Sequence, residues 1–401
     1  MKLKNTITKS LAMVILTVFW ICPIFAESAA FADEEYIPEI PTVWTKYDPA
    51  GTFEYNGLNP SCSGFPGTNP GFHFFAKGGT VNKLVIYFEG GGACWFDNMA
   101  VSPLSEKPVY NPMITMTTTI LEYGSGIFDL DNPKNPFKKW SIVYIPYCTG
   151  DLHIGAKDTI YYYDDTPFQV RHRGFVNFQA VLEWIKSNFA GPKQIFVTGS
   201  SAGGWGTNWN FPFIADAYPN SRTDFFADAG GGTFWGKEDF IMQKENWAIQ
   251  AADVYEPLEY RYGYEQVALL MDKYPNSKGG TWVAAFDEFG AFFMSVVQNP
   301  DNPYLWGYYP PFDPENPTGI WCNVNDLVLF ESTSLLMEKN YRSYVIEGNV
   351  HTFLGSPEFY SENSGGVPLY RWLTAMVNNP LEAKGQWQNL ACPDCLDPCG
   401  P

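Results

Sequence analysis

The stretch QIFVTGSSAGG, residues 194–204, decides the fold of this chain of 401 residues. Its apolar and β-branched first half predicts a short strand that is covered on both faces of a sheet. The small residues that follow predict a tight turn, with a helix after it. Gly199 and Gly203 place Ser201 at the centre of a G-x-S-x-G pattern, in which a strained turn lifts the hydroxyl of a nucleophilic serine above the sheet. Ser200 is the alternative one residue earlier, but the pair of glycines does not frame it.

Short apolar runs elsewhere in the sequence repeat this strand pattern. They occupy residues 83–88, 140–145, 225–227, 282–286 and 344–347. Most of them end in glycine or a polar residue, and apolar residues at helical spacing predict helices over 174–188 and 369–377. Strands that alternate with helices predict an α/β protein whose mostly parallel central sheet is flanked by helices. In such sheets, ligands bind beyond the carboxyl ends of the strands.

The N-terminal segment has the composition of a secretory signal peptide. Lysines precede an apolar run over residues 11–25, and small residues at 30–32 offer a cleavage site. The run is shorter than the roughly 20 apolar residues that span a bilayer. Residues 1–32 are therefore predicted to be a signal peptide, and the protein to be secreted, extracellular or periplasmic, with no membrane span after cleavage. Residues 33–401 are predicted to form a single domain, with a lid-like insertion over 290–340.

The chain carries a formal net charge of −18. So strong a negative charge repels phosphate backbones and anionic membrane surfaces, which argues against binding to nucleic acid. A neutral or esterified substrate suits this chain better than a polyanion. Hydrophobic residues make up 45% of the sequence, which is enough to build a large core.

Seven cysteines follow residue 32, and in an exported protein they are expected to form disulfides. Because seven is odd, at least one of them has no partner within the chain. Cys392, Cys395 and Cys399 make a cysteine-rich tail over residues 392–401. No second cysteine pair and no nearby histidine accompanies them, so a disulfide clasp is favoured over a zinc site, and no metal is expected.

Only one histidine, His351, follows Ser201 in the sequence. In α/β-hydrolases the nucleophile, the acid and the histidine follow one another in that order along the chain. His351 also lies in a loop just beyond the apolar run 344–347, where that fold places its general base. Order, position and uniqueness together predict an α/β-hydrolase fold in which His351 activates Ser201.

The acid that pairs with the histidine should lie between the serine and the histidine, beyond a strand end. Asp287 directly follows the apolar run 282–286 and is the favoured candidate. Asp228 follows an earlier, shorter run and is the runner-up. Asp326 precedes a helical stretch and fits the N-cap of that helix.

A hydrolase of this kind also needs backbone donors for the negatively charged oxygen of the tetrahedral intermediate. The amide of Ala202, directly after the serine, is one candidate. Gly91 and Gly92 end the first strong strand and are the others, since glycine lets bare amides approach a substrate. The triglycine lacks the glycine spacing of a dinucleotide site and the lysine of a P-loop, so no cofactor is expected.

Several stretches of the sequence match one family pattern together. They are FEGGGACW at 88–95, PYCTGD at 146–151, GSSAGG at 199–204, and the regions around 286–287 and 351–353. Together they resemble the pectin acetylesterase and Notum family of carboxylesterases. The resemblance implies a catalytic triad made of Ser201, Asp287 and His351. It also implies that the amides of Gly91, Gly92 and Ala202 bind the oxyanion.

The sequence therefore predicts a secreted serine carboxylesterase that hydrolyses short acyl esters, above all acetyl esters. Its substrate would be an acylated small molecule or polysaccharide, and no cofactor would take part. One alternative is a lipase or polyester hydrolase for longer acyl chains, which the aromatic stretch 304–312 would suit. Two alternatives from other classes are a secreted carbohydrate-binding protein and a catalytically inactive protein that serves in interactions.

Overall fold

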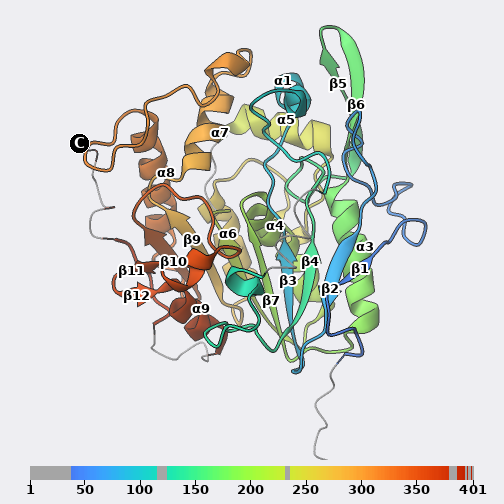
Figure 1. Ribbon diagram of the computed structural model, residues 1–401, viewed down its shortest axis with the longest axis vertical. Coiled ribbons are helices and arrows are strands. Elements are labelled where there is room, and N and C mark those ends of the chain that lie inside the picture. The colour runs from blue at the N-terminus through green and yellow to red at the C-terminus, as the bar shows by residue number, and fades with distance from the viewer. Residues whose placement is uncertain are drawn as a thin grey trace, which may run out of the picture. The chain divides into compact units, whose positions relative to one another are not determined.

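An eight-stranded sheet forms the centre of the computed structural model, in the order β1-β2-β4-β3-β7-β8-β9-β10 (Figure 1). Its strands are β1 (Thr45–Tyr47), β2 (Phe74–Lys77), β4 (Ser141–Ile145), β3 (Lys83–Phe88), β7 (Gln194–Ser200), β8 (Arg222–Asp228), β9 (Gly279–Ala284) and β10 (Tyr341–Ile346). Neighbours from β4 to β10 run parallel, and β1 and β2 pair antiparallel at one edge. The prediction of a mostly parallel sheet is confirmed.

The structure describes residues 38–114, 124–230, 235–378, 386–392, 395 and 399. The predicted signal peptide, residues 1–32, lies outside these residues, as does most of the cysteine-rich tail. None of the helices within the described ranges has the length and apolar character that crossing a bilayer requires.

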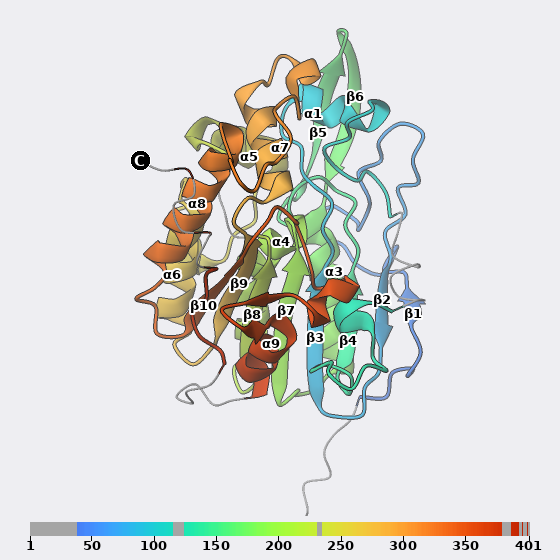
Figure 2. The ribbon, with the colours of Figure 1, turned by 60° about the vertical axis from the view of Figure 1, so that its left-hand side comes forward.

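Both faces of the sheet are buried, as its continuous apolar runs predict. In β3, Leu84, Ile86 and Phe88 join one core cluster, while Val85 and Tyr87 join the cluster on the opposite face. Figure 2 shows α9 (Leu369–Asn378) across one face, with α3 (Gly174–Asn188) and α4 (Ala202–Ala217) on the other. The predicted helix over 174–188 is confirmed at both ends. The remaining described α-helices are α1 (Asp97–Val101), α5 (Lys237–Trp247), α6 (Gly263–Lys273), α7 (Glu288–Gln298) and α8 (Ile320–Ser334).

Two features of the fold escaped the sequence analysis. The strands β1 and β2 are only three and four residues long, too short for a periodic pattern to reveal. A separate two-stranded hairpin, β5 (Lys157–Tyr163) with β6 (Thr166–His172), rises at the end of the sheet where α1 and α7 lie (Figure 1). Residues 290–340, expected to be a lid-like insertion, contain α8 and most of α7, which connect β9 to β10. The role of this segment as a lid stays a prediction.

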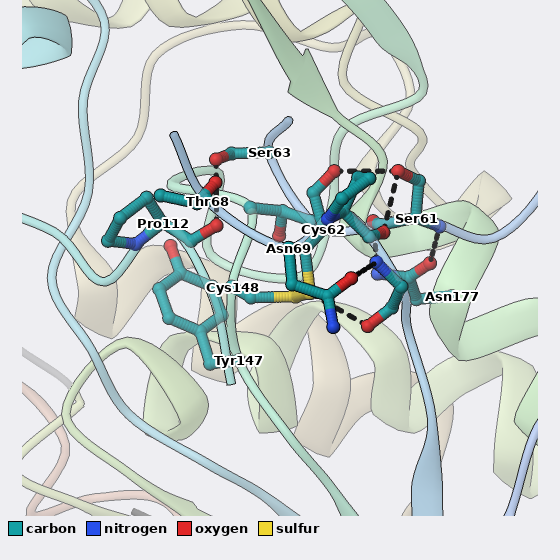
Figure 3. The surroundings of a disulfide bond; sticks show 12 residues. Ser61, Cys62, Ser63, Thr68, Asn69, Pro112, Tyr147, Cys148 and Asn177 are labelled. Atoms are coloured by element: carbon teal, nitrogen blue, oxygen red, sulfur yellow. Dashed lines mark hydrogen bonds between the residues drawn. A yellow bond between two sulfur atoms is a disulfide. The ribbon is translucent and has the colours of Figure 1, made fainter. Parts of the chain in front are cut away.

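The cysteines pair as the exported character of the chain predicts. Disulfides join Cys62 to Cys148, Cys322 to Cys399, and Cys392 to Cys395, and Cys94 is buried as a free thiol. The first of these ties the segment before β2 to the segment after β4, and Figure 3 shows it beside Tyr147. The second ties the C-terminal tail to α8, which is the clasp that the sequence predicts.

Candidate active site

Ser201 occupies a strained turn between β7, which ends at Ser200, and α4, which begins at Ala202. Its φ of 56° and ψ of −124° lie in a region that residues with a side chain rarely adopt. The conformation is held because the Ser201 amide donates a hydrogen bond to the Asp228 carbonyl, at 2.8 Å. Gly203 must be small, because a Cβ there would collide with the carbonyl oxygen of Phe88. The turn therefore has the geometry that the G-x-S-x-G pattern predicts.

His351 and Asp287 meet at the carboxyl ends of neighbouring strands. Asp287 caps the start of α7 beyond β9, and His351 lies in the loop beyond β10. The imidazole Nδ1 lies 2.7 Å from one carboxylate oxygen of Asp287 and 2.9 Å from the other. Burial by itself would lower the pKa of His351, but the charge and hydrogen bond of Asp287, together with the charges of Asp228 and Glu288, raise that pKa above its usual value. A carboxylate can only accept, so Nδ1 carries the proton and Nε2 is left with a free lone pair.

Ser201 and His351 line the same cleft, which has a volume of about 660 Å³. The Nε2 atom of His351 is buried and has no hydrogen-bond partner in the part of the chain that the structure describes. Phe289 stacks on the imidazole, with ring centroids 4.6 Å apart. The hydrogen bond between a catalytic serine and its histidine is often long or absent in a protein without substrate. The cleft thus brings together a strained serine and a histidine whose free nitrogen is available.

Asp228, the runner-up acid, lies close by but has different partners. Its buried carboxylate accepts hydrogen bonds from the Ser200 hydroxyl at 2.6 Å and from the amides of Phe353 and Leu354 at 3.2 and 3.0 Å. Burial raises the pKa of Asp228 to about 6. Asp228 therefore holds the loop that carries His351 and makes no hydrogen bond to the imidazole, among the contacts of the described residues.

The triglycine loop, residues 90–92, borders the cleft beside Ser201. Gly92 has a φ of +74°, and a Cβ there would collide with the Val109 carbonyl, so glycine is required. The backbone bridge to residues 109–111 uses the Gly91 carbonyl and the Ala93 amide, which leaves the Gly92 amide outside the bridge. Ala202 begins α4, where the first amides of a helix have no partner within it. Gly91 and Gly92 thus line the cleft together with Ser201, and Gly92 and Ala202 line the recess beside it.

The cleft has an apolar recess and a wider part that also carries polar side chains. Next to Ser201 and His351 is a recess of about 40 Å³, whose other lining residues are almost all apolar and include Ala93, Trp95, Leu152, Trp205, Trp235 and Phe293. The wider part adds polar side chains, among them Tyr87, Glu89, Asn111, Tyr144, Thr352 and Ser356, to apolar ones such as Phe292 and Val350. Burial raises the pKa of Glu89 to about 7. The fold thus offers two chemically different environments to the two halves of a substrate.

The sequence assigned no role to the aromatic and polar residues among these lining residues. Two of them had a local signal: Trp205 lies one helical turn beyond Ser201, and Phe289 follows Asp287 by two residues. Trp95 and Glu89 flank the triglycine, and only the glycines of that stretch were predicted to take part in the site. Phe293 lies one helical turn beyond Phe289 on α7, whereas Trp235 comes from a segment where no motif indicates it.

The fold and this arrangement of side chains define an α/β-hydrolase-like protein. Residues 59–251 match the model of a protein family described as Pectinacetylesterase, so the resemblance seen in the sequence is confirmed over that part of the chain. The matched range contains Gly91, Gly92, Ser201 and Ala202. Asp287 and His351 lie beyond it, and the assignment of their roles rests on their geometry.

Curated relatives agree with this match at low identity. The chain is 26% identical to pectin acetylesterase 4 of Arabidopsis thaliana over 172 residues, which are 41% of this chain and 39% of the relative. It is 25% identical to the palmitoleoyl-protein carboxylesterase NOTUM of Mus musculus and of Homo sapiens, over 43% of this chain in both cases and 34% and 35% of the relatives. The matches thus span well under half of the length of these relatives.

Proposed function

We propose that this chain is an exported serine carboxylesterase that hydrolyses short acyl esters, above all acetyl esters. One observation carries the proposal. Asp287 binds Nδ1 of His351, and the free Nε2 belongs to the same cleft as Ser201 on its strained turn. Serine, histidine and acid in this chain order and with this bonding are the machinery of acyl transfer in α/β-hydrolases.

In the proposed mechanism, the Nε2 atom of His351 takes the proton of the Ser201 hydroxyl as its oxygen attacks the ester carbonyl. Asp287 holds the imidazole by Nδ1 and stabilises the imidazolium that forms. The tetrahedral intermediate then collapses, and His351 gives its proton to the departing alcohol. A water molecule, deprotonated by His351, cleaves the acyl-enzyme and releases the acid. The reaction uses no metal or organic cofactor.

The oxygen of the tetrahedral intermediate would be bound by the amides of Gly91, Gly92 and Ala202. The N-terminus of α4 supports this role, since its free amides and its dipole favour negative charge. Loss of one such donor costs about 10²–10³ in rate in a serine hydrolase.

The apolar recess supports a short acyl group. A cavity needs roughly 10–15 Å³ of such volume for each water-sized group, so about 40 Å³ admits about three non-hydrogen atoms. An acetyl group has that size, whereas a long acyl chain would require the tryptophan walls of the recess to move apart. The wider part of the cleft, with its polar side chains, supports a leaving group with several hydroxyls, such as a sugar in an acylated polysaccharide.

Export is part of the proposal. The disulfides Cys62–Cys148 and Cys322–Cys399 suit an oxidising compartment, either outside the cell or in a periplasm. The net charge of −18 suits an uncharged or esterified substrate and does not suit nucleic acid.

The proposal is tested with the purified protein in two assays. A fluorophosphonate probe should label Ser201, as identified by peptide mass spectrometry, and p-nitrophenyl esters from acetate to palmitate should give the highest kcat/KM for acetate. Ser201→Ala should abolish both signals. Ser187→Ala is the matched control, because Ser187 is exposed on α3 and bonds only its own helix, to the Glu183 carbonyl.

Each contrary result has a definite meaning. Highest activity on long-chain esters would replace the short-acyl proposal by the lipase or polyester hydrolase. Absence of labelling and of hydrolysis in the folded protein would favour an inactive interaction protein, or a carbohydrate-binding protein if acetylated polysaccharide is bound. Activity that survives in Ser201→Ala would show that another nucleophile acts.

A further inference from the structure

Three consecutive glycines have little intrinsic preference for one backbone shape, so the shape of the triglycine loop depends on its contacts. A second segment, residues 146–153, leaves the carboxyl end of β4, the strand that pairs with β3. We call it the anchoring segment. It contains the PYCTGD stretch, to which the mechanism assigns no role. Since β3 and β4 are parallel neighbours, the anchoring segment and the triglycine loop leave the sheet at the same edge.

We propose that Tyr147 and His153 are positioning residues, which fix the triglycine loop in the shape that binds the oxyanion. The inference rests on the proposed function. The Tyr147 hydroxyl donates to the Gly92 carbonyl at 2.7 Å, and His153 Nε2 lies 2.9 Å from the Glu89 carbonyl. These two contacts lie at the two ends of the loop.

The protonation of His153 follows from its surroundings. Burial lowers its pKa to about 4, so the ring is neutral at ordinary pH. A carbonyl oxygen can only accept a hydrogen bond, and therefore Nε2 carries the single proton and donates it to Glu89. Glu89 is held a second time, because its carboxylate accepts a hydrogen bond from the Tyr147 amide at 2.9 Å.

Because peptide groups are planar, a hydrogen bond that holds a carbonyl also orients the amide of the next residue. In a planar trans peptide, the carbonyl of one residue and the amide of the next point in opposite directions, so a held carbonyl fixes the amide behind it. His153 fixes the peptide before Gly90 and Tyr147 fixes the peptide after Gly92. The Asn111 amide fixes the peptide between Gly91 and Gly92, through the Gly91 carbonyl at 2.8 Å. His153 and Tyr147 thus orient the peptides at the two ends of the triglycine, and Asn111 orients the peptide that carries the Gly92 amide.

The anchoring segment is itself rigid. Its Asp151 is buried and accepts hydrogen bonds from the Thr149 hydroxyl at 2.6 Å and from the Gly174 amide at 2.7 Å, at the start of α3. The Cys62–Cys148 disulfide ties the segment to the chain before β2 (Figure 3). His153 has a φ of 64°, a costly conformation that persists only where the surroundings enforce it. A support held in this way can impose a shape on a flexible loop.

Preorganised donors contribute to the transition state far more than to substrate binding. Tyr147→Phe and His153→Leu each remove one donor and keep most of the side-chain volume. We expect each variant to lower kcat for p-nitrophenyl acetate by about 10–100-fold and to change KM by less than about threefold. His153→Gln keeps a donor near the position of Nε2 and should recover most of the rate.

A transition-state analogue separates positioning from general damage. Methylboronic acid adds to a serine hydroxyl and forms a tetrahedral adduct, so its Ki should rise in parallel with the loss of kcat. Tyr218→Phe is the matched control: it also removes a buried tyrosine hydroxyl, which donates to the Phe189 carbonyl at 3.1 Å where α3 and α4 end and bonds neither the triglycine loop nor the anchoring segment. It should leave kcat and Ki unchanged.

Rates are expressed per active site, counted by fluorophosphonate labelling, with thermal melting as a check on folding. If Tyr147→Phe and His153→Leu keep the wild-type kcat and Ki per labelled site, the inference is wrong, whether or not their melting temperatures fall. Failure of His153→Gln to recover activity above His153→Leu would also contradict it. A wild-type protein that is neither labelled nor active would instead contradict the proposed function.

Discussion

Asp228 and Asp287 lie at the ends of the neighbouring strands β8 and β9, and both are almost fully buried. Both lie near His351, yet their carboxylates have different hydrogen-bond partners. Asp287 binds the imidazole itself, and Asp228 binds the amides of the following loop at Phe353 and Leu354. The comparison teaches that a buried carboxylate at the correct sheet edge has no fixed role. The group that its oxygens face decides whether it acts on the imidazole of His351, the proposed base, or holds the loop that carries this histidine.

The largest effect is expected from Ser201→Ala. Its residual rate is the reference against which the losses in the two aspartate variants are compared. Loss of the nucleophile should lower kcat for p-nitrophenyl acetate by about 10⁶-fold, as in other serine hydrolases. Steady-state hydrolysis measures this loss. If Asp287→Asn or Asp228→Asn proved more damaging than Ser201→Ala, their effects would have to come from unfolding and not from catalysis.

Asp287→Asn should be next, with a loss of about 10⁴-fold in kcat. An asparagine keeps the shape but offers an amide donor to Nδ1, and so favours the wrong tautomer of His351. Urea denaturation checks folding, since the exchange also weakens the pairing of a buried acceptor with His351 and should cost about 1–3 kcal/mol. A loss below about tenfold would show that Asp287 is not the acid and would return Asp228 to consideration.

The two acids should also differ in the pH dependence of kcat/KM. The base must be neutral, so activity rises with pH through the pKa of His351, which Asp287 holds above 6.5. Without the carboxylate, burial lowers that pKa, and the acidic limb of the profile should move to lower pH in Asp287→Asn. In Asp228→Asn the limb should move much less. An equal shift of the acidic limb in both variants would show that Asp287 and Asp228 do not differ in their effect on the pKa of His351.

Asp228→Asn should lower kcat by about 10–100-fold, because the loop that carries His351 loses an acceptor and shifts. The variant should also unfold more easily, by about 1–3 kcal/mol, since the amides of Phe353 and Leu354 and the Ser200 hydroxyl lose part of their pairing in a buried site. Urea denaturation measures this second effect. Unchanged stability would mean that Asp228 does not hold the loop.

Ser200→Ala should have the smallest effect. It removes the hydroxyl between Tyr87 and Asp228, at 2.9 and 2.6 Å, and should cost about 1–2 kcal/mol of stability and less than about tenfold in kcat. The fluorophosphonate should still label the protein at Ser201. If labelling were lost in Ser200→Ala and kept in Ser201→Ala, the nucleophile would be Ser200.

Much of the sheet was predictable because each strand carries its own signal. The runs at 83–88 and 194–198 read as buried strands by their apolar continuity, and the structure has β3 and β7 there. β1 and β2 were not found, since so short a pairing is set by the neighbour strand and not by local pattern. Likewise the walls of the apolar recess come from segments far apart in sequence, such as Trp95 and Phe293.

By itself the sequence determined the strand-turn-helix around Ser201, the fold class and the choice of His351, because these depend on local spacing and on the order of residues along the chain. The sequence favours Asp287 over Asp228 as the acid. It does not indicate what either carboxylate contacts, since both residues simply follow apolar runs. Only the tertiary structure decided that Asp287 faces an imidazole 64 residues away while Asp228 faces backbone amides. The reason is that a carboxylate takes its role from its nearest donor, and packing between strands, not sequence, brings that donor within reach.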